Sequence, residues 1–199
     1  MIKEISKEEL LNLLTGNFIG SGNYGLIVEQ NDRVVYKVYY NDLRDTHCNG
    51  DMDTLTKELE EKKSNKNYLK YKEELLKKIE VLGNTKSNVI KGMLVCEDYP
   101  VGVVMKNLST YKDFRLCFSS LSVTDQVKVL GKLKEIINEL YENNISLFDF
   151  KADNIMIDTK TLDVKLVDLD GEATAYGMNE NITFDECMEF IEKNSKQTL

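Results

Sequence analysis

Asp149-Phe150-Lys151-Ala152-Asp153-Asn154 is the most informative stretch of this sequence, and it follows a long helical pattern. A second motif, Val167-Asp168-Leu169-Asp170-Gly171, comes one short apolar hairpin pattern later. Each motif alone is also typical of an ordinary polar loop or turn. The two motifs in this order and at this spacing are a far more specific signal than either one.

A glycine-rich segment near the start of the chain, Gly20-Ser21-Gly22-Asn23-Tyr24-Gly25, supplies a further signal. In a dinucleotide-binding loop such glycines open a helix, but here Leu26-Ile27-Val28 continues as a strand. A glycine hairpin can instead lie over a triphosphate, because the missing Cβ atoms let backbone N–H groups approach the phosphate oxygens. A simple glycine turn is the alternative for this segment taken alone.

Lys37 interrupts the apolar strand pattern Val34-Val35-Tyr36-Lys37-Val38-Tyr39, twelve positions after Gly25. A lysine in a strand usually faces solvent, so its position alone does not separate a functional role from a structural one. Its place directly after the glycine hairpin favours a phosphate-binding role.

Taken together and in this chain order, the motifs resemble those of the protein kinase superfamily. Asp-x-Lys-x-x-Asn is its catalytic loop, and Asp168 matches the metal-binding Asp of the segment usually written Asp-Phe-Gly. The resemblance covers roughly residues 16–170 and implies an α+β fold with two lobes. We expect residues 1–106 to form an N-terminal lobe with a leading helix, the glycine-rich hairpin, a five-stranded antiparallel sheet and one further helix, helix C. Residues 107–199 would form a truncated, mostly helical C-terminal lobe with the catalytic loop and the metal-binding segment.

The resemblance also implies roles for individual residues. Asp149 would accept or orient the proton of the substrate hydroxyl, and Lys151 would neutralise charge on the moving γ-phosphoryl group. Lys37 would hold the α- and β-phosphates of ATP, while Asn154 and Asp168 would hold Mg²⁺. The other residues expected to contact the nucleotide, or to pair with Lys37, are Gly20, Gly22, Gly25, Ile19, Ile27, Val35, Glu73, Met105, Lys106 and Leu108. The apolar members of this set are equally good core residues.

The sequence departs from the kinase pattern beside both motifs. Leu147-Phe148 stands where kinases usually have His-Arg before the catalytic Asp, which leaves no arginine there to bind a phosphorylated activation loop. We therefore expect any activity to be independent of loop phosphorylation. Leu169-Asp170 replaces the usual Phe-Gly after the metal-binding Asp, and Gly171 comes one position late.

The glutamate of helix C that would pair with Lys37 is ambiguous. An alignment based on Leu75 and Leu76 as inward residues places Lys72 at that position. Glu73 or Glu74 takes the position only if the register shifts, and we select Glu73.

The largest departure is length, because only 31 residues follow Asp168. They contain no Ala-Pro-Glu segment and leave room for one helix rather than a peptide-binding platform. The chain thus looks like the minimal protein kinases of some tRNA-modification complexes and small secreted bacterial effectors. In those proteins a partner often supplies or activates what is missing.

Capping and periodicity signals predict the remaining elements. Ser6 with Glu9 forms a capping-box pattern before a short leucine-rich helix, and Thr183 with Glu186 forms another before a helix of about 184–194. The other expected elements are three antiparallel strands within 18–40, a polar loop over 41–54, a helix of about 68–82, a hairpin of 89–96 and 101–105, a long core helix after Ser122, and short strands at 155–157 and 164–167.

Composition narrows the class of protein. The chain has 199 residues and a formal charge of −8, from 34 acidic and 26 basic side chains, which argues against a nucleic-acid binder. No apolar run reaches the roughly 18 residues needed to cross a bilayer, so we expect no membrane span. Acidic residues near the N-terminus argue against a secretory signal. The default compartment is the cytoplasm, with secretion as a bacterial effector the alternative.

The four cysteines are widely separated along the chain, and we expect reduced thiols: Cys48, Cys96, Cys117 and Cys187. His47 is the one histidine, so neither a zinc site with Cys48 nor a histidine-based nucleophilic mechanism is expected.

The leading functional hypothesis is ATP- and Mg²⁺-dependent transfer of the γ-phosphoryl group to Ser or Thr of a protein. Lys151 favours it over a small-molecule kinase, because related small-molecule kinases usually carry His at that position. A pseudokinase that acts as a scaffold through a partner protein is the hypothesis from a different class. The altered segment after Asp168 favours the scaffold, whereas the joint presence of Lys37, Asp149, Asn154 and Asp168 opposes it. ATP binding without transfer would favour the scaffold.

Overall fold

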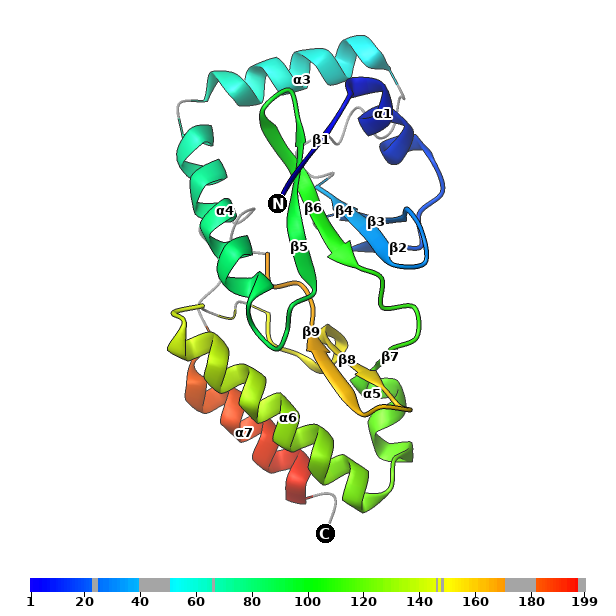
Figure 1. Cartoon of the computed structure of the whole chain (residues 1–199), viewed down its shortest axis with the longest axis vertical. Helices are drawn as coiled ribbons and strands as arrows, with labels where there is room; N and C mark the ends of the chain where they lie inside the picture. Colours follow the sequence, from blue (N-terminus) through cyan, green and yellow to red (C-terminus); the bar gives the residue numbers. More distant parts are fainter. Residues whose placement is uncertain are drawn as a thin grey trace. The chain divides into compact units, whose positions relative to one another are not determined.

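The computed structural model describes residues 1–22, 25–39, 51–65, 67–145, 147, 149–170 and 182–196 (Figure 1). The chain forms two compact units of α+β structure, one of Met1–Glu80 with Ile90–Asn107 and one of Val81–Val89 with Leu108–Leu199. The segment Val81–Val89 is therefore part of the second unit, although it precedes the expected lobe boundary at residue 106. No helix in the described ranges is long and apolar enough to cross a membrane.

The first unit is built on a six-stranded sheet, with strand order β1-β5-β6-β4-β3-β2. The strands are β1 Ile2–Ile5, β2 Gly20–Gly22, β3 Gly25–Glu29, β4 Val34–Val38, β5 Ile90–Cys96 and β6 Tyr99–Lys106. The predicted meander β2-β3-β4 and the predicted hairpin β5-β6 are confirmed, and both are antiparallel.

The prediction of a five-stranded antiparallel sheet is wrong at its edge. The short β1 pairs with β5 in parallel, with Ile2 opposite Met93 and Ile5 opposite Cys96. Four residues are too few to show an alternating pattern, and the strong cap signal at Ser6 follows at once. The sixth strand is therefore a consequence of tertiary pairing that the local sequence did not indicate.

Three helices belong wholly or mostly to the first unit: α1 Lys7–Thr15, α3 Met52–Ser64 and α4 Tyr68–Gly83. The capping box of α1 is confirmed, because Ser6 Oγ accepts from the Glu9 N–H and the Glu9 carboxylate accepts from the Ser6 N–H. The prediction of a single helix besides α1 is wrong. Helix α3 begins where a polar loop was expected, and Asp51 caps it by accepting from Asp53 and Thr54.

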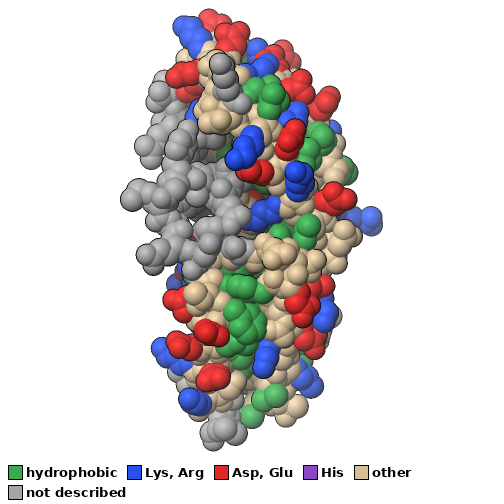
Figure 2. Space-filling view, turned by 90° about the vertical axis from the view of Figure 1, so that its left-hand side faces the viewer, with side chains coloured by type: hydrophobic (Ala, Val, Ile, Leu, Met, Phe, Trp, Pro, Cys, Tyr) green, Lys and Arg blue, Asp and Glu red, His purple; other side chains and the backbone are tan. Residues whose placement is uncertain are grey.

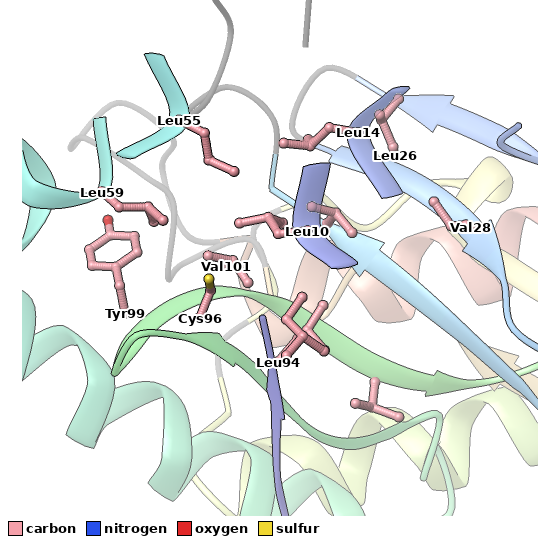
Figure 3. Close-up of a cluster of buried hydrophobic side chains, with 13 residues drawn as sticks. Leu10, Leu14, Leu26, Val28, Leu55, Leu59, Leu94, Cys96, Tyr99 and Val101 are labelled. Carbon is pink, nitrogen blue, oxygen red and sulfur yellow. The ribbon is translucent and has the colours of Figure 1, made fainter. Parts of the chain in front are cut away.

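The core of the first unit lies between one face of the sheet and the helices α1 and α3. Leu10 and Leu14 of α1 and Leu55 and Leu59 of α3 have no exposed side-chain surface, and Figure 3 shows them directed toward the strands. The strand residues of this cluster include Leu26, Val28, Val38, Leu94, Cys96, Val101 and Val104. Because successive strand residues point to opposite faces, the odd-numbered residues of β3 and β4 point to the other face.

The turn between β5 and β6 joins the hairpin to all three helices of this unit. Glu97 and Asp98 have φ of 47° and 69°, which are the left-handed conformations of a two-residue type I′ turn. Glu97 forms an ion pair of 2.9 Å with Lys7 of α1 and one of 3.8 Å with Lys63 of α3. Asp98 forms an ion pair of 3.2 Å with Lys72 of α4.

The second unit combines helices with a three-stranded sheet of order β7-β8-β9. Its elements are β7 Lys112–Asp113, α5 Phe114–Cys117, η1 Phe118–Ser120, α6 Val123–Glu142, η2 Ala152–Asn154, β8 Ile155–Asp158, β9 Asp163–Leu166 and α7 Phe184–Lys196. The predicted long helix after Ser122, the β8-β9 hairpin and the Thr183–Glu186 capping box of the last helix are confirmed.

Ser87 closes the outer edge of β9. Its Oγ donates to the Leu166 carbonyl and accepts from the Leu166 N–H, both at 2.9 Å, and Ser87 is only 1% exposed. Next to it, Lys165 Nζ donates to the Lys86 carbonyl at 2.6 Å. The Ser87 hydroxyl thus satisfies the two main-chain groups that a further strand would otherwise have paired.

Charged side chains of both signs are mixed over the described surface of the face in Figure 2. The described cysteines Cys96, Cys117 and Cys187 are buried free thiols, and burial raises the pKa of Cys96 and of Cys187 to about 11. His47 and Cys48 lie outside the described residues.

Substitution Ser87→Ala should lower the free energy of unfolding by about 1–3 kcal/mol, because the buried N–H and C=O of Leu166 lose their partner. Urea denaturation followed by circular dichroism measures this change. Ser64→Ala is the matched control, since Ser64 is exposed and its hydroxyl donates to the Glu61 carbonyl of its own helix. Equal effects of the two substitutions would contradict the edge-closing role of Ser87.

The three buried thiols should react slowly with a disulfide reagent such as DTNB in the native protein. At pH 8 a thiol with a pKa of about 11 is almost entirely protonated, and only the thiolate attacks. In a Cys48→Ser variant we expect no rapid reaction before addition of denaturant and reaction of all three thiols after it. Rapid reaction of a thiol in the folded variant would refute the assigned burial.

Candidate functional site

The glycine hairpin is formed by β2 and β3, with Gly20 opposite Ile27 and Gly22 opposite Gly25. The preceding Ile19 extends this pairing, because its N–H donates to the Ile27 carbonyl at 2.8 Å. The tip residues Asn23 and Tyr24 lie outside the described residues.

Gly25 is required by the packing of β4. A Cβ at this position would lie 2.8 Å from the Val38 carbonyl oxygen and 3.3 Å from Lys37 Cγ. A Cβ on Gly20 would meet only ordinary contacts of 3.8 Å with Ile27. The absence of a side chain at Gly25 therefore lets the stem of Lys37 pass directly beneath the hairpin.

Lys37 lies in the middle of the sheet on the face opposite the α1–α3 core. It is 7% exposed, and its register partners are Ile27 of β3 and Val103 of β6. Val35, two residues earlier in β4, lies opposite Met105. Register partners share a face of the sheet, so the structure brings Ile27, Val35, Lys37 and Met105 together as the prediction required.

The segment after β6 is fixed by Asn107, which the sequence did not indicate. The Asn107 side chain donates to Glu29 Oε1 and to the Asn31 carbonyl, both at 3.0 Å, and its N–H donates to the Arg33 carbonyl at 2.9 Å. Among Lys106–Leu108, the Asn107 N–H is therefore committed to the β3-β4 turn. The Leu108 carbonyl also accepts from the Tyr111 N–H at 2.8 Å, so two of the backbone groups expected to face an adenine ring are engaged within the fold.

Glu73 does not occupy the position expected for a partner of Lys37. The buried stripe of α4 runs through Leu75 and Ile79, whereas Glu73 is exposed. Lys72 is the residue beside that stripe, and its Nζ pairs with Asp98. The helix thus presents a lysine where the resemblance required a glutamate.

In the second unit, the predicted catalytic residues form one hydrogen-bonded group. Lys151 Nζ lies 2.5 Å from Asp149 Oδ2. Asn154 Nδ2 donates to the Asp149 carbonyl at 2.8 Å and to Asp149 Oδ2 at 3.3 Å. The hydrogen bond that Lys151 donates to Asp149 is the main cause that raises the pKa of Lys151 above its ordinary value.

The β8-β9 hairpin places Asn154 and Asp168 at adjoining strand ends. Ile155 lies opposite Leu166, and the Val167 N–H donates to the Asn154 carbonyl at 2.9 Å. Asp168 itself has φ of 62°, a left-handed conformation that costs a non-glycine residue about 1–2 kcal/mol. Strain of this kind concentrates at functional sites. Gly171 and Phe148, the neighbours at which the sequence departs from the kinase pattern, lie outside the described residues.

The oxygen atoms of Asn154 and Asp168 fit the chemistry of Mg²⁺. The Asn154 amide nitrogen donates to Asp149, so its oxygen can face a cation, and the Asp168 carboxylate is near enough to raise the pKa of Lys151. Mg²⁺ is usually held by one or two protein oxygens together with phosphate oxygens and water. The described part of the chain contains no cluster of three or more His, Cys, Asp or Glu, so phosphate and water would complete the ligand set.

Arg115 of α5 also reaches the catalytic loop. Its guanidinium lies 3.2 Å from Asp153 and 3.5 Å from Asp113. The sequence offered no signal for this contact, because Arg115 and Asp153 are brought together only by the fold.

No protein-family model matches the chain, and no curated protein is significantly similar to it. Function therefore has to be inferred from the residues and their geometry.

Asp168→Gly should be more stable than Asp168→Ala by about 1 kcal/mol, because both variants lose the carboxylate but only glycine relieves the left-handed backbone. Urea denaturation of the two variants measures the difference. The same pair at Asp158, a strand residue, should give the opposite sign. An alanine variant at 168 as stable as the glycine variant would rule out the strained conformation.

Proposed function

We propose that the chain is an ATP- and Mg²⁺-dependent phosphotransferase that moves the γ-phosphoryl group to a Ser or Thr hydroxyl of a protein substrate. The observation that carries this proposal is the hydrogen-bonded group of Asp149, Lys151 and Asn154, tied through the Val167 N–H to the strained Asp168. A chance polar loop has no reason to combine these contacts with strain at the residue that the motif assigns to metal binding.

Asp149 is suited to act on the substrate hydroxyl. Its Oδ2 is engaged by Lys151 and Asn154, which fixes the carboxylate while 44% of its side-chain surface stays exposed. In the proposed reaction the hydroxyl oxygen forms a bond to the γ-phosphorus as the bond to the β-γ bridging oxygen breaks. The hydroxyl proton passes to Asp149, and ADP is the leaving group.

Lys151 supplies positive charge to the phosphoryl group in transfer. A lysine is cationic at neutral pH and the contact with Asp149 raises its pKa further, while 50% of its side-chain surface is exposed to an approaching phosphate. Such fixed charges accelerate phosphoryl transfer mainly by stabilising the charge that develops on the oxygens. Bound Mg²⁺ would neutralise further phosphate charge, with Asn154 and Asp168 as its protein ligands.

The first unit is suited to hold the nucleotide. Lys37 lies beneath Gly25 on the sheet face that also carries Ile27, Val35 and Met105, and these residues offer a cation and an apolar surface. We assign the α- and β-phosphates to Lys37 and the hairpin backbone, and the adenine ring to the apolar residues.

An activating protein partner is part of the proposal. Glu73 is exposed and Lys72 is paired with Asp98, so the glutamate that the resemblance implies is not at the expected position of α4. These two observations also favour the second candidate function, a scaffold that binds ATP without transferring phosphate. Because the activity consumes ATP, we propose the cytoplasm as its compartment, that of the producing cell or of a host cell.

Asp149→Asn should lower the transfer of labelled γ-phosphate from Mg·ATP by at least roughly 10²-fold, because the amide cannot accept the hydroxyl proton. Transfer is measured with the purified chain, alone and with cell lysate as the source of substrate and partner. Asp153→Asn is the matched control in the same loop. Its carboxylate faces the exposed Arg115, so transfer should stay within about twofold of the wild type.

The location of the label separates the alternatives. Label in protein that disappears with Asp149→Asn supports the proposed kinase, whereas label only in small molecules supports a small-molecule kinase. Thermal stabilisation by ATP with no transfer under any condition supports the scaffold.

A further inference from the structure

An aromatic cluster connects the last helix to the catalytic loop. The Phe190 ring of α7 lies 5.2 Å from the Phe150 ring in an edge-to-face arrangement and 5.6 Å from the Phe114 ring. Phe114 in turn stacks on Phe118 at 4.2 Å. Phe150 directly follows Asp149, so the ring next to the proposed proton acceptor is packed by Phe190 of α7, which in turn contacts Phe114 of α5.

The residues that precede α7 hold the same loop from its other side. The Ile182 N–H donates to the Leu147 carbonyl at 2.8 Å, and the Ile182 carbonyl accepts from the Tyr141 hydroxyl of α6. Leu147 is 3% exposed and comes two residues before Asp149. The segment 182–196 therefore contacts the catalytic loop both before and after Asp149.

These contacts differ in kind from the bonds among Asp149, Lys151 and Asn154. The polar bonds join loop residues to one another, and their side chains are partly exposed. The contacts of Leu147 and Phe150 instead join the loop to elements of the packed unit. A catalytic carboxylate has to be held within about 0.5 Å by packed neighbours to be effective, and Phe150 and Leu147 are placed to provide that hold.

We propose that the segment 182–196 sets the position of Asp149, with Phe190 as a positioning residue that acts through Phe150. This inference rests on the proposed phosphotransferase function. It assigns the last helix a role in the activity itself, because a catalytic group displaced by about 1 Å loses roughly 10²-fold in rate.

Phe190→Ala tests the proposal, with Phe184→Ala as the matched control. Phe184 is on the same helix, and its ring makes a similar edge-to-face contact at 5.4 Å, but with Tyr141 of α6 rather than with the loop. We expect Phe190→Ala to lower kcat roughly 10²-fold and Phe184→Ala to lower it much less, because Phe184 reaches the loop only indirectly, through Tyr141 and Ile182. KM for ATP should change much less than kcat in both, because Lys37 and the glycine hairpin, to which we assign the α- and β-phosphates, belong to the first unit.

Hydrogen exchange gives a readout that does not depend on activity. In Phe190→Ala the amides of residues 147–157 should exchange faster, while those of β3 and β4 and those of α6 keep wild-type rates. Phe190→Leu keeps an apolar side chain and should give intermediate loop exchange and intermediate kcat. This second variant keeps the test decisive if Phe190→Ala unfolds.

The outcomes separate this inference from the proposed function. If the wild type transfers phosphate but Phe190→Ala and Phe190→Leu behave like Phe184→Ala, the positioning role is overturned. Faster loop exchange with unchanged kcat overturns it as well. If the wild type transfers no phosphate, the proposed function fails, and selective loosening of 147–157 in the Phe190 variants still supports the hold of α7 on the loop.

Discussion

Ser87 and Leu166 form the pair of hydrogen bonds on which the arrangement of the second unit depends. A strand at the edge of a sheet has one row of N–H and C=O groups without strand partners, and in β9 the Ser87 hydroxyl takes both groups of Leu166. With its outer side occupied, Leu166 lies opposite Ile155 on its inner side. That register puts Asn154 and Asp168 at neighbouring strand ends, so a single serine on the Val81–Val89 segment fixes the strand that leads to Asp168, a proposed metal ligand.

The two faces of the sheet in the first unit differ in chemistry. One face is apolar, and the other holds the cationic side chain of Lys37. Helices α1 and α3 cover the first face with leucines, which leaves the alternate residues of β3 and β4 for other chemistry. Lys37 is buried there, and burial of an ammonium group is costly unless the surroundings compensate for it. Gly25 is the residue that makes room for its aliphatic stem. The same glycine therefore serves the packing of the sheet and, in the proposed function, the approach of a phosphate.

Most signals that lie within a few residues were interpreted correctly, with helix α3 and its Asp51 cap as the exception, whereas the pairings of β1 and of Ser87 with distant residues were not predicted. Both capping boxes and the β8-β9 hairpin follow from local patterns. The capping residues are three positions apart, and the two strands of the hairpin are close in sequence. The parallel strand β1 depends on residues about 90 positions away, and Ser87 meets Leu166 across 79 positions. The choice of Glu73 over Lys72 depended on the register of helix α4. Leucines at successive positions define the buried face of a helix only to within one residue. The burial of Leu75 and Ile79 fixes that face and leaves Glu73 exposed.

The strand order of the first unit also constrains when it can fold during synthesis. The strands β5 and β6, which lie between β1 and β4, are translated after every other element of the sheet and after α1 and α3. A nascent chain that has not yet reached residue 106 can form the β2-β3-β4 meander, but β1 and the leucines of α1 and α3 still lack the strands on which they pack. Until then this apolar surface is exposed to solvent, which makes the half-synthesised protein a natural client for chaperones that bind nascent chains.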